Sequence, residues 1–161
     1  MADLVTHLAT ALLPGALVGR RIAAVALGTA LPDLGARVAP MALEALQQRG
    51  LPVPDGLILA FGVLHEPLPL VLLCAVLAGA FAPGVRVPTL LGLWLGCGIH
   101  LALDVTQDHH GQGYFLLAPF HLGRYELGWI GSEATVDWAP GLAIATAAAW
   151  LARWAWLRKR G

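Results

Sequence analysis

Residues 87–106 read VPTLLGLWLGCGIHLALDVT, an unbroken apolar run that ends in one histidine and one aspartate. Twenty residues are about the length that an α-helix needs to cross the hydrocarbon core of a bilayer. Within this run, His100 and Asp104 are four residues apart, so both side chains lie on one helix face. Ionisable groups inside a membrane span are costly and usually functional. The segment therefore predicts a membrane helix with a polar site near one end.

The whole chain has the composition of a membrane protein. Of its 161 residues, 58% are hydrophobic and 12% are charged, against about 25% charged residues in soluble domains. Five apolar segments can be recognised, at residues 4–19, 21–33, 57–82, 87–106 and 138–157. These predict an all-α integral membrane protein: a single domain, 1–161, built as a compact bundle of about five hydrophobic helices, the first two short. Residues 39–49 predict an additional short helix, either along the membrane interface or packed in a loop.

Charge distribution predicts the orientation of the chain. Lys and Arg in short loops mark the cytoplasmic side of a membrane protein. With five spans, one face carries no acidic residue and holds Arg20, Arg21, Arg86, Arg153, Arg158, Lys159 and Arg160. All acidic residues and all histidines fall on the other face, which predicts an N-terminus outside and a C-terminus in the cytoplasm. The formal net charge is zero and no basic stripe is present, which argues against a nucleic-acid partner.

Five residues of metal-ligand type lie near the ends of four consecutive segments. Because successive spans alternate in direction, these ends are expected to meet at one membrane face. Taken singly, each has a plainer interpretation: a lone histidine in an apolar helix more often forms a hydrogen bond in the core, and an aspartate at a helix end is often a cap or turn residue. Together they predict a shared site formed by His7, Asp33, His65, His100 and Asp104. The roles of His109, His110 and His121 stay open.

The order of short motifs resembles a known family. The motifs are Asp3-x-x-Thr6-His7, Ala30-Leu31-Pro32-Asp33, a mid-chain histidine at position 65, Gly98-x-His100-x-x-x-Asp104-x-Thr106 and Gly113-x-x-Leu116-x-x-Pro119-Phe120. Over roughly residues 1–121 this order is similar to that of the YdjM-like family of membrane-bound metal-dependent hydrolases. The resemblance implies a helical protein of the bacterial inner (plasma) membrane with metal-dependent hydrolase activity. It also implies that the five residues above are functional positions.

The sequence departs from the family pattern around its mid-chain histidine. The family has an element resembling Arg-Gly-x-Thr-His-Ser, whereas this chain reads FGVLHEP at 61–67. The arginine and both hydroxyl side chains are missing, and Glu66 stands in the place of the serine. If that arginine helps to hold a phosphate, substrate handling must differ here, and Glu66 becomes a candidate acid or base.

Three imidazoles and two carboxylates suit Zn²⁺, with Mn²⁺ or Fe²⁺ as alternatives, held as one or two ions. The expected ligands are His7, His65 and His100, with Asp33 and Asp104 as further ligands or as a general base. A metal-activated water acting on a membrane lipid or a lipid-linked ester, most readily a phosphoester, is the expected chemistry. The alternatives are a metal carrier or sensor that activates no water, and a scaffold in which the polar cluster only holds helices together.

Overall fold

The computed structural model describes residues 4–18, 22–111 and 113–159. It is almost entirely helical, which confirms the predicted all-α class. The elements are α1 (Leu4–Val18), α2 (Ile22–Asp33), a π-helical turn (Leu34–Val38), α3 (Ala39–Gln48), α4 (Asp55–Gly62), a 3₁₀ turn (Val63–His65), α5 (Pro67–Gly79), α6 (Pro83–Thr106), β1 (Gln107–Asp108), β2 (Ile130–Gly131) and α7 (Ser132–Arg158). The two strands form one short parallel pair. Asp3, Arg20, Arg21 and Arg160, which entered the sequence predictions, lie outside the described residues.

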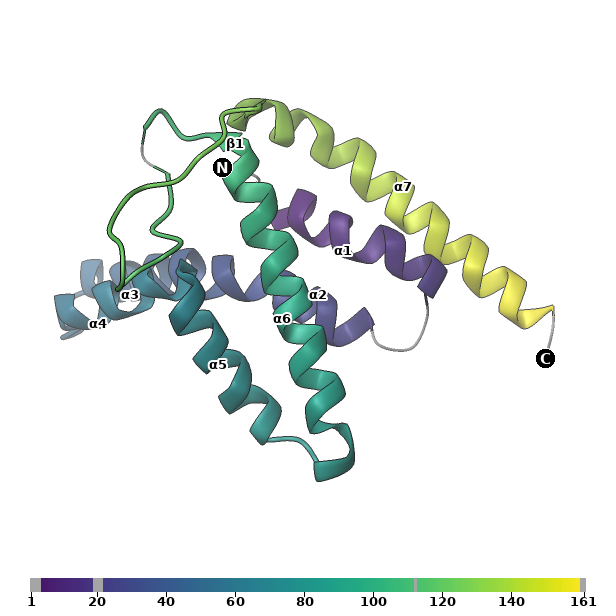
Figure 1. Cartoon of the computed structure of the whole chain (residues 1–161), viewed down its shortest axis with the longest axis horizontal. Helices are drawn as coiled ribbons and strands as arrows, with labels where there is room; N and C mark the ends of the chain where they lie inside the picture. The colour runs from purple at the N-terminus through teal and green to yellow at the C-terminus, as the bar shows by residue number, and fades with distance from the viewer. Residues whose placement is uncertain (1–3, 19–21, 112, 160–161) are drawn as a thin grey trace.

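The helices meet at several different angles. In Figure 1, α5 and α6 form a hairpin, α2 passes behind α6, and α1 and α7 run alongside each other to one side of the hairpin. The α2–α6 crossing is close because it is built on glycine. A Cβ atom at Gly96 would overlap the backbone oxygen of Val25, and one at Gly28 would overlap that of Leu93. Only glycine permits this approach of two backbones. The crossing brings the end of α2 against the last turns of α6, where the candidate residues lie.

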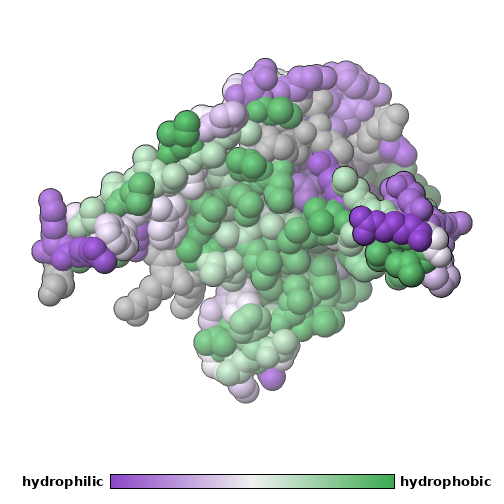
Figure 2. Space-filling model, turned by 180° about the vertical axis from the view of Figure 1, so that it is seen from behind, coloured by the Kyte–Doolittle hydropathy of each residue, from purple (hydrophilic) through white to green (hydrophobic). Residues whose placement is uncertain are grey.

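Two helices of the described chain are long and apolar enough to cross a membrane: the continuous rod Ile22–Gln48 and α6. A third span results only if the pair Asp55–His65 and Pro67–Gly79 is counted as one, although it is bent by 93°. Large apolar side chains are exposed widely, for example Val76 and Ile144. Figure 2 shows an extensive apolar surface with hydrophilic atoms gathered at its margins. Such a surface is typical of a protein that contacts lipid, so the chain has the character of a membrane protein.

The predicted bundle of five hydrophobic spans is not confirmed. The segment 21–33 and the short helix at 39–49 do form, as α2 and α3, but the π turn joins them into one continuous rod. The segment at 39–49 is therefore the second half of that rod instead of a separate surface helix. In the π turn, the Ala39 N–H bonds to the carbonyl of Leu34, five residues back. This wider turn lets the helix pass Pro40, which has no N–H to donate.

The third segment, 57–82, is broken where it was predicted to be continuous. Glu66 adopts an extended backbone, with φ −91° and ψ 148°. The residue before a proline is disfavoured in the helical region, and Pro67 follows Glu66 directly. The chain turns sharply there and places His65 at the inside of the bend. The fifth segment forms part of α7, which begins earlier than predicted and is not among the two candidate spans.

Candidate metal centre

The centre is assembled from four separate parts of the chain. His7 lies in the first turn of α1, Asp33 ends α2, His65 ends the 3₁₀ turn before the bend, and His100 and Asp104 lie in the last two turns of α6. All five are buried: His7, His100 and Asp104 are 0% exposed, Asp33 is 2% exposed and His65 is 6% exposed. Ionisable side chains are rarely fully buried unless they are paired or bind a metal.

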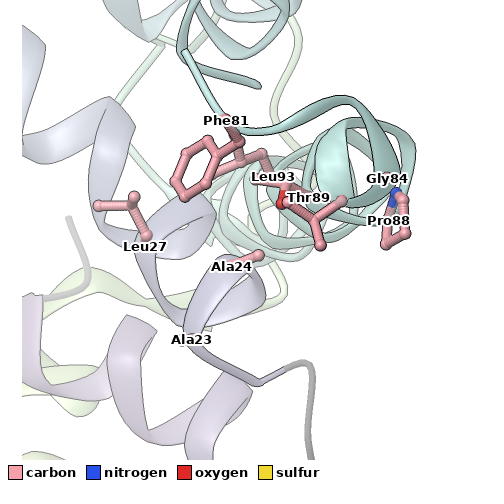
Figure 3. A pocket seen from close by; sticks show the side chains of 9 residues that line it. Ala23, Ala24, Leu27, Phe81, Gly84, Pro88, Thr89 and Leu93 are labelled. Carbon is pink, nitrogen blue, oxygen red and sulfur yellow. The ribbon is translucent and has the colours of Figure 1, made fainter. Parts of the chain in front are cut away.

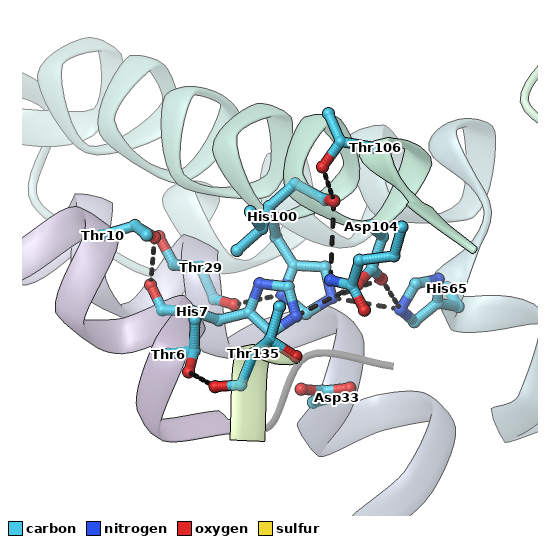
Figure 4. Close-up of polar contacts among 12 residues, drawn as sticks. Thr6, His7, Thr10, Thr29, Asp33, His65, His100, Asp104, Thr106 and Thr135 are labelled. Carbon is cyan, nitrogen blue, oxygen red and sulfur yellow. Dashed lines mark hydrogen bonds and ion pairs between the residues drawn. The ribbon is translucent and has the colours of Figure 1, made fainter. Parts of the chain in front are cut away.

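Asp104 is at the middle of the group (Figure 4). Its Oδ1 lies 3.1 Å from Nε2 of His7, and its Oδ2 lies 3.1 Å from Nε2 of His65. Nε2 of His100 is 3.3 Å from the same Oδ2 and 3.1 Å from Nε2 of His65. The rings of His7 and His100 are stacked, with centroids 3.8 Å apart. Five potential ligand atoms, on four side chains from three segments of the chain, are therefore connected by contacts at hydrogen-bond distance.

These separations match the spacing of ligand atoms around one divalent ion. Ligands at about 2.0 Å from a tetrahedral Zn²⁺ are about 3.3 Å from one another. The potential ligand atoms of His7, His100 and Asp104 all lie within 4.8 Å of one another, as do those of Asp33, His65 and His100. The buried donors could hold a metal ion with small adjustments of the side chains.

The orientation of His100 is fixed by a second contact. Its Nδ1 lies 2.7 Å from the backbone oxygen of Thr29, which can only accept, so Nδ1 carries the proton. Its Nε2 is then left with a lone pair directed at Asp104 and His65. This is how a metal-binding histidine is normally held in the correct tautomer. Thr6, next to His7, donates to the backbone oxygen of Thr135 at 2.8 Å and so ties α1 to α7.

Several buried polar atoms of the centre have no hydrogen-bond partner within the described residues. They include Nδ1 of His7, Nδ1 of His65, Oδ2 of Asp33 and the side-chain oxygen of Gln107. One proton on Nε2 of His65 can serve either Asp104 or His100, but it cannot serve both. Nε2 of His7 and both oxygens of Asp104 also lack such a partner in the described part of the chain, and a cation among the Nε2 atoms and the carboxylate would satisfy these three atoms at once. The donor set therefore fits a divalent ion.

The site residues predicted from the sequence do not all contribute to the centre in the same way. His7, His65, His100 and Asp104 are brought together as predicted. Asp33 is adjacent, and its Oδ1 forms an ion pair with Nε of Arg37 at 3.1 Å. Glu66 belongs to neither group of candidate ligands. Its carboxylate lies instead near the His65 imidazole, the Phe115 backbone and the Arg124 guanidinium.

The loop between α6 and α7 covers the centre, which the sequence did not predict. Glu126 accepts hydrogen bonds from the backbone N–H of His109 and of Gly111. His109 Nε2 donates to the backbone oxygen of Asp104 at 3.0 Å, so this histidine supports the end of α6. His110 and His121 are exposed and belong to neither group of candidate ligands.

Tyr114 and Arg37 are further residues of the centre that the sequence predictions missed. The Tyr114 ring stacks on His65, with centroids 4.8 Å apart and an angle of 18° between the planes. Burial, followed by the nearby Asp104 carboxylate, raises the pKa of the Tyr114 phenol above its ordinary value. The phenol therefore stays neutral and can donate at neutral pH. No spacing rule links position 37 or 114 to the histidines, since the link depends on the π turn and on the loop.

Two apolar grooves lie along α6, and one of them reaches the centre. One, of about 450 Å³, is formed by the start of α2 and by the α5–α6 turn, with Leu27, Phe81 and Leu93 in its lining (Figure 3). The other, of about 320 Å³, lies between α1, α2 and α6. Its lining includes Thr10, one turn from His7, and Ile99, next to His100. The second groove thus begins close to the candidate ligands and continues along the apolar surface.

Comparisons of the chain with protein-family models, with curated proteins and with solved structures found no significant match.

Proposed function

We propose that this chain is a metal-dependent hydrolase of the membrane, related to the YdjM-like family, that acts on a lipid or lipid-linked phosphoester. The observation that carries the proposal is the meeting of four side chains, those of His7, His65, His100 and Asp104, through contacts of 3.1–3.3 Å in a buried site. The mixture of imidazole and carboxylate donors favours Zn²⁺, with Mn²⁺ or Fe²⁺ as alternatives. Bound there, a divalent ion would lower the pKa of a water to about 7 and polarise a phosphoryl oxygen.

The two aspartates have different environments, which suggests different roles. Both oxygens of Asp104 face imidazole nitrogens, so Asp104 serves as a ligand. Asp33 has one oxygen beside Arg37 and the other without a hydrogen-bond partner in the described part of the chain. It is therefore the better general base, accepting the proton of the attacking water at its free oxygen. Glu66, at the edge of the centre, is the candidate acid that protonates the leaving group.

The surroundings of the centre favour a lipid substrate. The centre lies at the end of α6, a candidate membrane span, and the groove between α1, α2 and α6 begins beside it. An acyl or prenyl chain in that groove would place its head group at the ligands. The orientation predicted from the basic residues would put the centre on the extracytoplasmic side.

A metal carrier or sensor is the second candidate function. Complete burial of His7, His100 and Asp104 favours it, because a catalytic ion must keep a position open to water. The two functions differ in one measurable property: a carrier holds the ion without cleaving any ester.

Hydrolysis by the purified protein distinguishes these functions. The zinc-loaded protein, in detergent, should be assayed with a panel of lipid phosphomonoesters and phosphodiesters, before and after treatment with a chelator. We expect cleavage of at least one substrate, loss of cleavage on chelation and recovery on adding Zn²⁺. His100→Ala should be inactive, whereas His121→Ala, which changes an exposed histidine, should retain activity. Stoichiometric metal with no cleavage across the panel would favour the carrier.

A further inference from the structure

A partly buried guanidinium group lies beside the metal centre. Arg37 is in the π-helical turn, one helical turn after Asp33, and its Nε pairs with Asp33 at 3.1 Å. Its Nη2 is buried and has no hydrogen-bond partner within the described ranges. A guanidinium carries five N–H donors in a planar fork, so the pair with Asp33 leaves donors unused. A charged N–H donor that is buried without an acceptor lowers the stability of the fold, unless a ligand accepts its hydrogen bond.

A second donor lies beside the same centre. The Tyr114 hydroxyl is buried, forms no well-aligned hydrogen bond within the described residues, and lies close to the Asp104 carboxylate. The charges that act on its phenol include those of Asp104, Arg37 and Asp33, so the hydroxyl and the guanidinium share one electrostatic environment. Two buried donors from distant elements thus lie beside a group of candidate metal ligands.

The backbone conformation around Arg37 also suggests that this residue has a functional role. π-helical turns inside α-helices are rare and are frequently found at functional sites. A π turn contains one residue more than an α-helical turn, so it changes which side chains after Asp33 face the centre. It also supplies an arginine beside Asp33, one of the candidate ligands.

We propose that Arg37 and Tyr114 bind the non-reacting oxygens of a phosphate group whose remaining oxygen faces the metal ligands. This rests on the proposed function and narrows its substrate class to phosphate esters. An arginine fork matches two phosphate oxygens at once, and a neutral phenol can donate to one of the same two, which leaves the third non-bridging oxygen for the metal ligands. Asp33 holds the guanidinium through Nε, and Nη2 forms no hydrogen bond within the described residues.

Binding of inorganic phosphate tests this inference without any need for hydrolysis. Calorimetric titration of the zinc-loaded protein with phosphate should be compared for the wild type, Arg37→Lys and Tyr114→Phe. Both variants are conservative: the first keeps the charge beside Asp33, and the second keeps the ring on His65. Losing the fork should weaken phosphate binding about tenfold or more, and losing the hydroxyl should weaken it about threefold to tenfold, as for charge-assisted hydrogen bonds.

Matched controls are available on the same chain. Arg49→Lys changes an exposed arginine, and Tyr125→Phe changes another tyrosine of the loop, so both should bind phosphate like the wild type. Wild-type phosphate affinity in Arg37→Lys, with zinc content unchanged, would overturn the inference. A different result would overturn only the proposed hydrolase activity. In that case the wild type would bind phosphate, Arg37→Lys would bind it more weakly, and neither protein would cleave an ester.

Discussion

Asp104 presents its two carboxylate oxygens to three imidazole rings inside an apolar protein. In the absence of compensating charge, a buried carboxylate costs several kcal/mol, and removing one member of such a group typically costs about 3–5 kcal/mol. His100 is held by the Thr29 carbonyl, so its ring cannot turn away from the carboxylate. The polar group is thus fixed in place before any ligand arrives. This pre-organisation is what a metal site requires.

The difference between the two aspartates gives a prediction at the residue scale. Asp33→Asn keeps the shape of the side chain but removes its capacity to accept a proton. We expect hydrolysis to fall by about 10²–10⁴-fold, as for loss of a general base. Metal content should stay near that of the wild type, because Asp104 and the three histidines remain. Activity assays and elemental analysis of the same preparation check both parts.

Two results would contradict this assignment of Asp33. Loss of the metal in Asp33→Asn would make Asp33 a ligand, and unchanged activity would remove it from the chemistry. Glu44→Gln, an exposed acidic residue on α3, is the matched control. Its metal content and activity should equal those of the wild type.

At the residue scale, the sequence was informative where spacing along one helix determines geometry. The four-residue separation of His100 and Asp104 was sufficient to predict that they face together. Arg37 and Tyr114 could not be found in this way. Their positions depend on a π turn and on a long loop, and neither is specified by local periodicity.

The shape of the elements depends on two prolines. Pro67 forces an extended backbone at Glu66, which turns the chain and places His65 at a bend. The Glu66-Pro67 pair is a signal that could have predicted this break. The helix passes Pro40 by means of the π turn, and no comparable sequence signal marks that feature. Hydropathy alone therefore identified the apolar segments but misjudged where two of them begin and end.

The glycine contact between α2 and α6 gives a prediction at the element scale. In Gly96→Ala the new methyl group would meet the backbone of Val25, Gly28 and Thr29. We expect the free energy of unfolding to fall by about 1–3 kcal/mol, as for overpacking of a close contact. Metal affinity should fall as well, because α2 carries Thr29 and Asp33. Thermal unfolding in detergent measures the first effect, and metal titration measures the second.

Gly98→Ala is the control for this prediction. Gly98 lies two residues away on the same helix, and a Cβ there meets nothing within 4 Å. Alanine is favoured over glycine in a helix by about 1 kcal/mol, so this variant should be as stable as the wild type or slightly more stable. Equal stability of the two alanine variants would show that the α2–α6 approach is not tight.

At the scale of the whole molecule, the candidate ligands do meet, but not for the reason that the sequence suggested. Alternating spans were expected to bring four helix ends to one face. Instead, Asp33 lies within a continuous rod, His65 lies at a bend, and α6 crosses α2. The helices deliver these side chains to one point through packing that is specific to this fold. The predicted orientation of the chain stays a prediction.

The metal content of the purified protein is the most direct test of this assembly. Elemental analysis should be made after purification in detergent without added metal, on the wild type, Asp104→Asn and His121→Ala. We predict at least one transition-metal ion per chain in the wild type and in His121→Ala, and none in Asp104→Asn. A wild-type protein that holds no such ion even after incubation with Zn²⁺, or an Asp104→Asn variant with wild-type content, would contradict a metal centre at these residues.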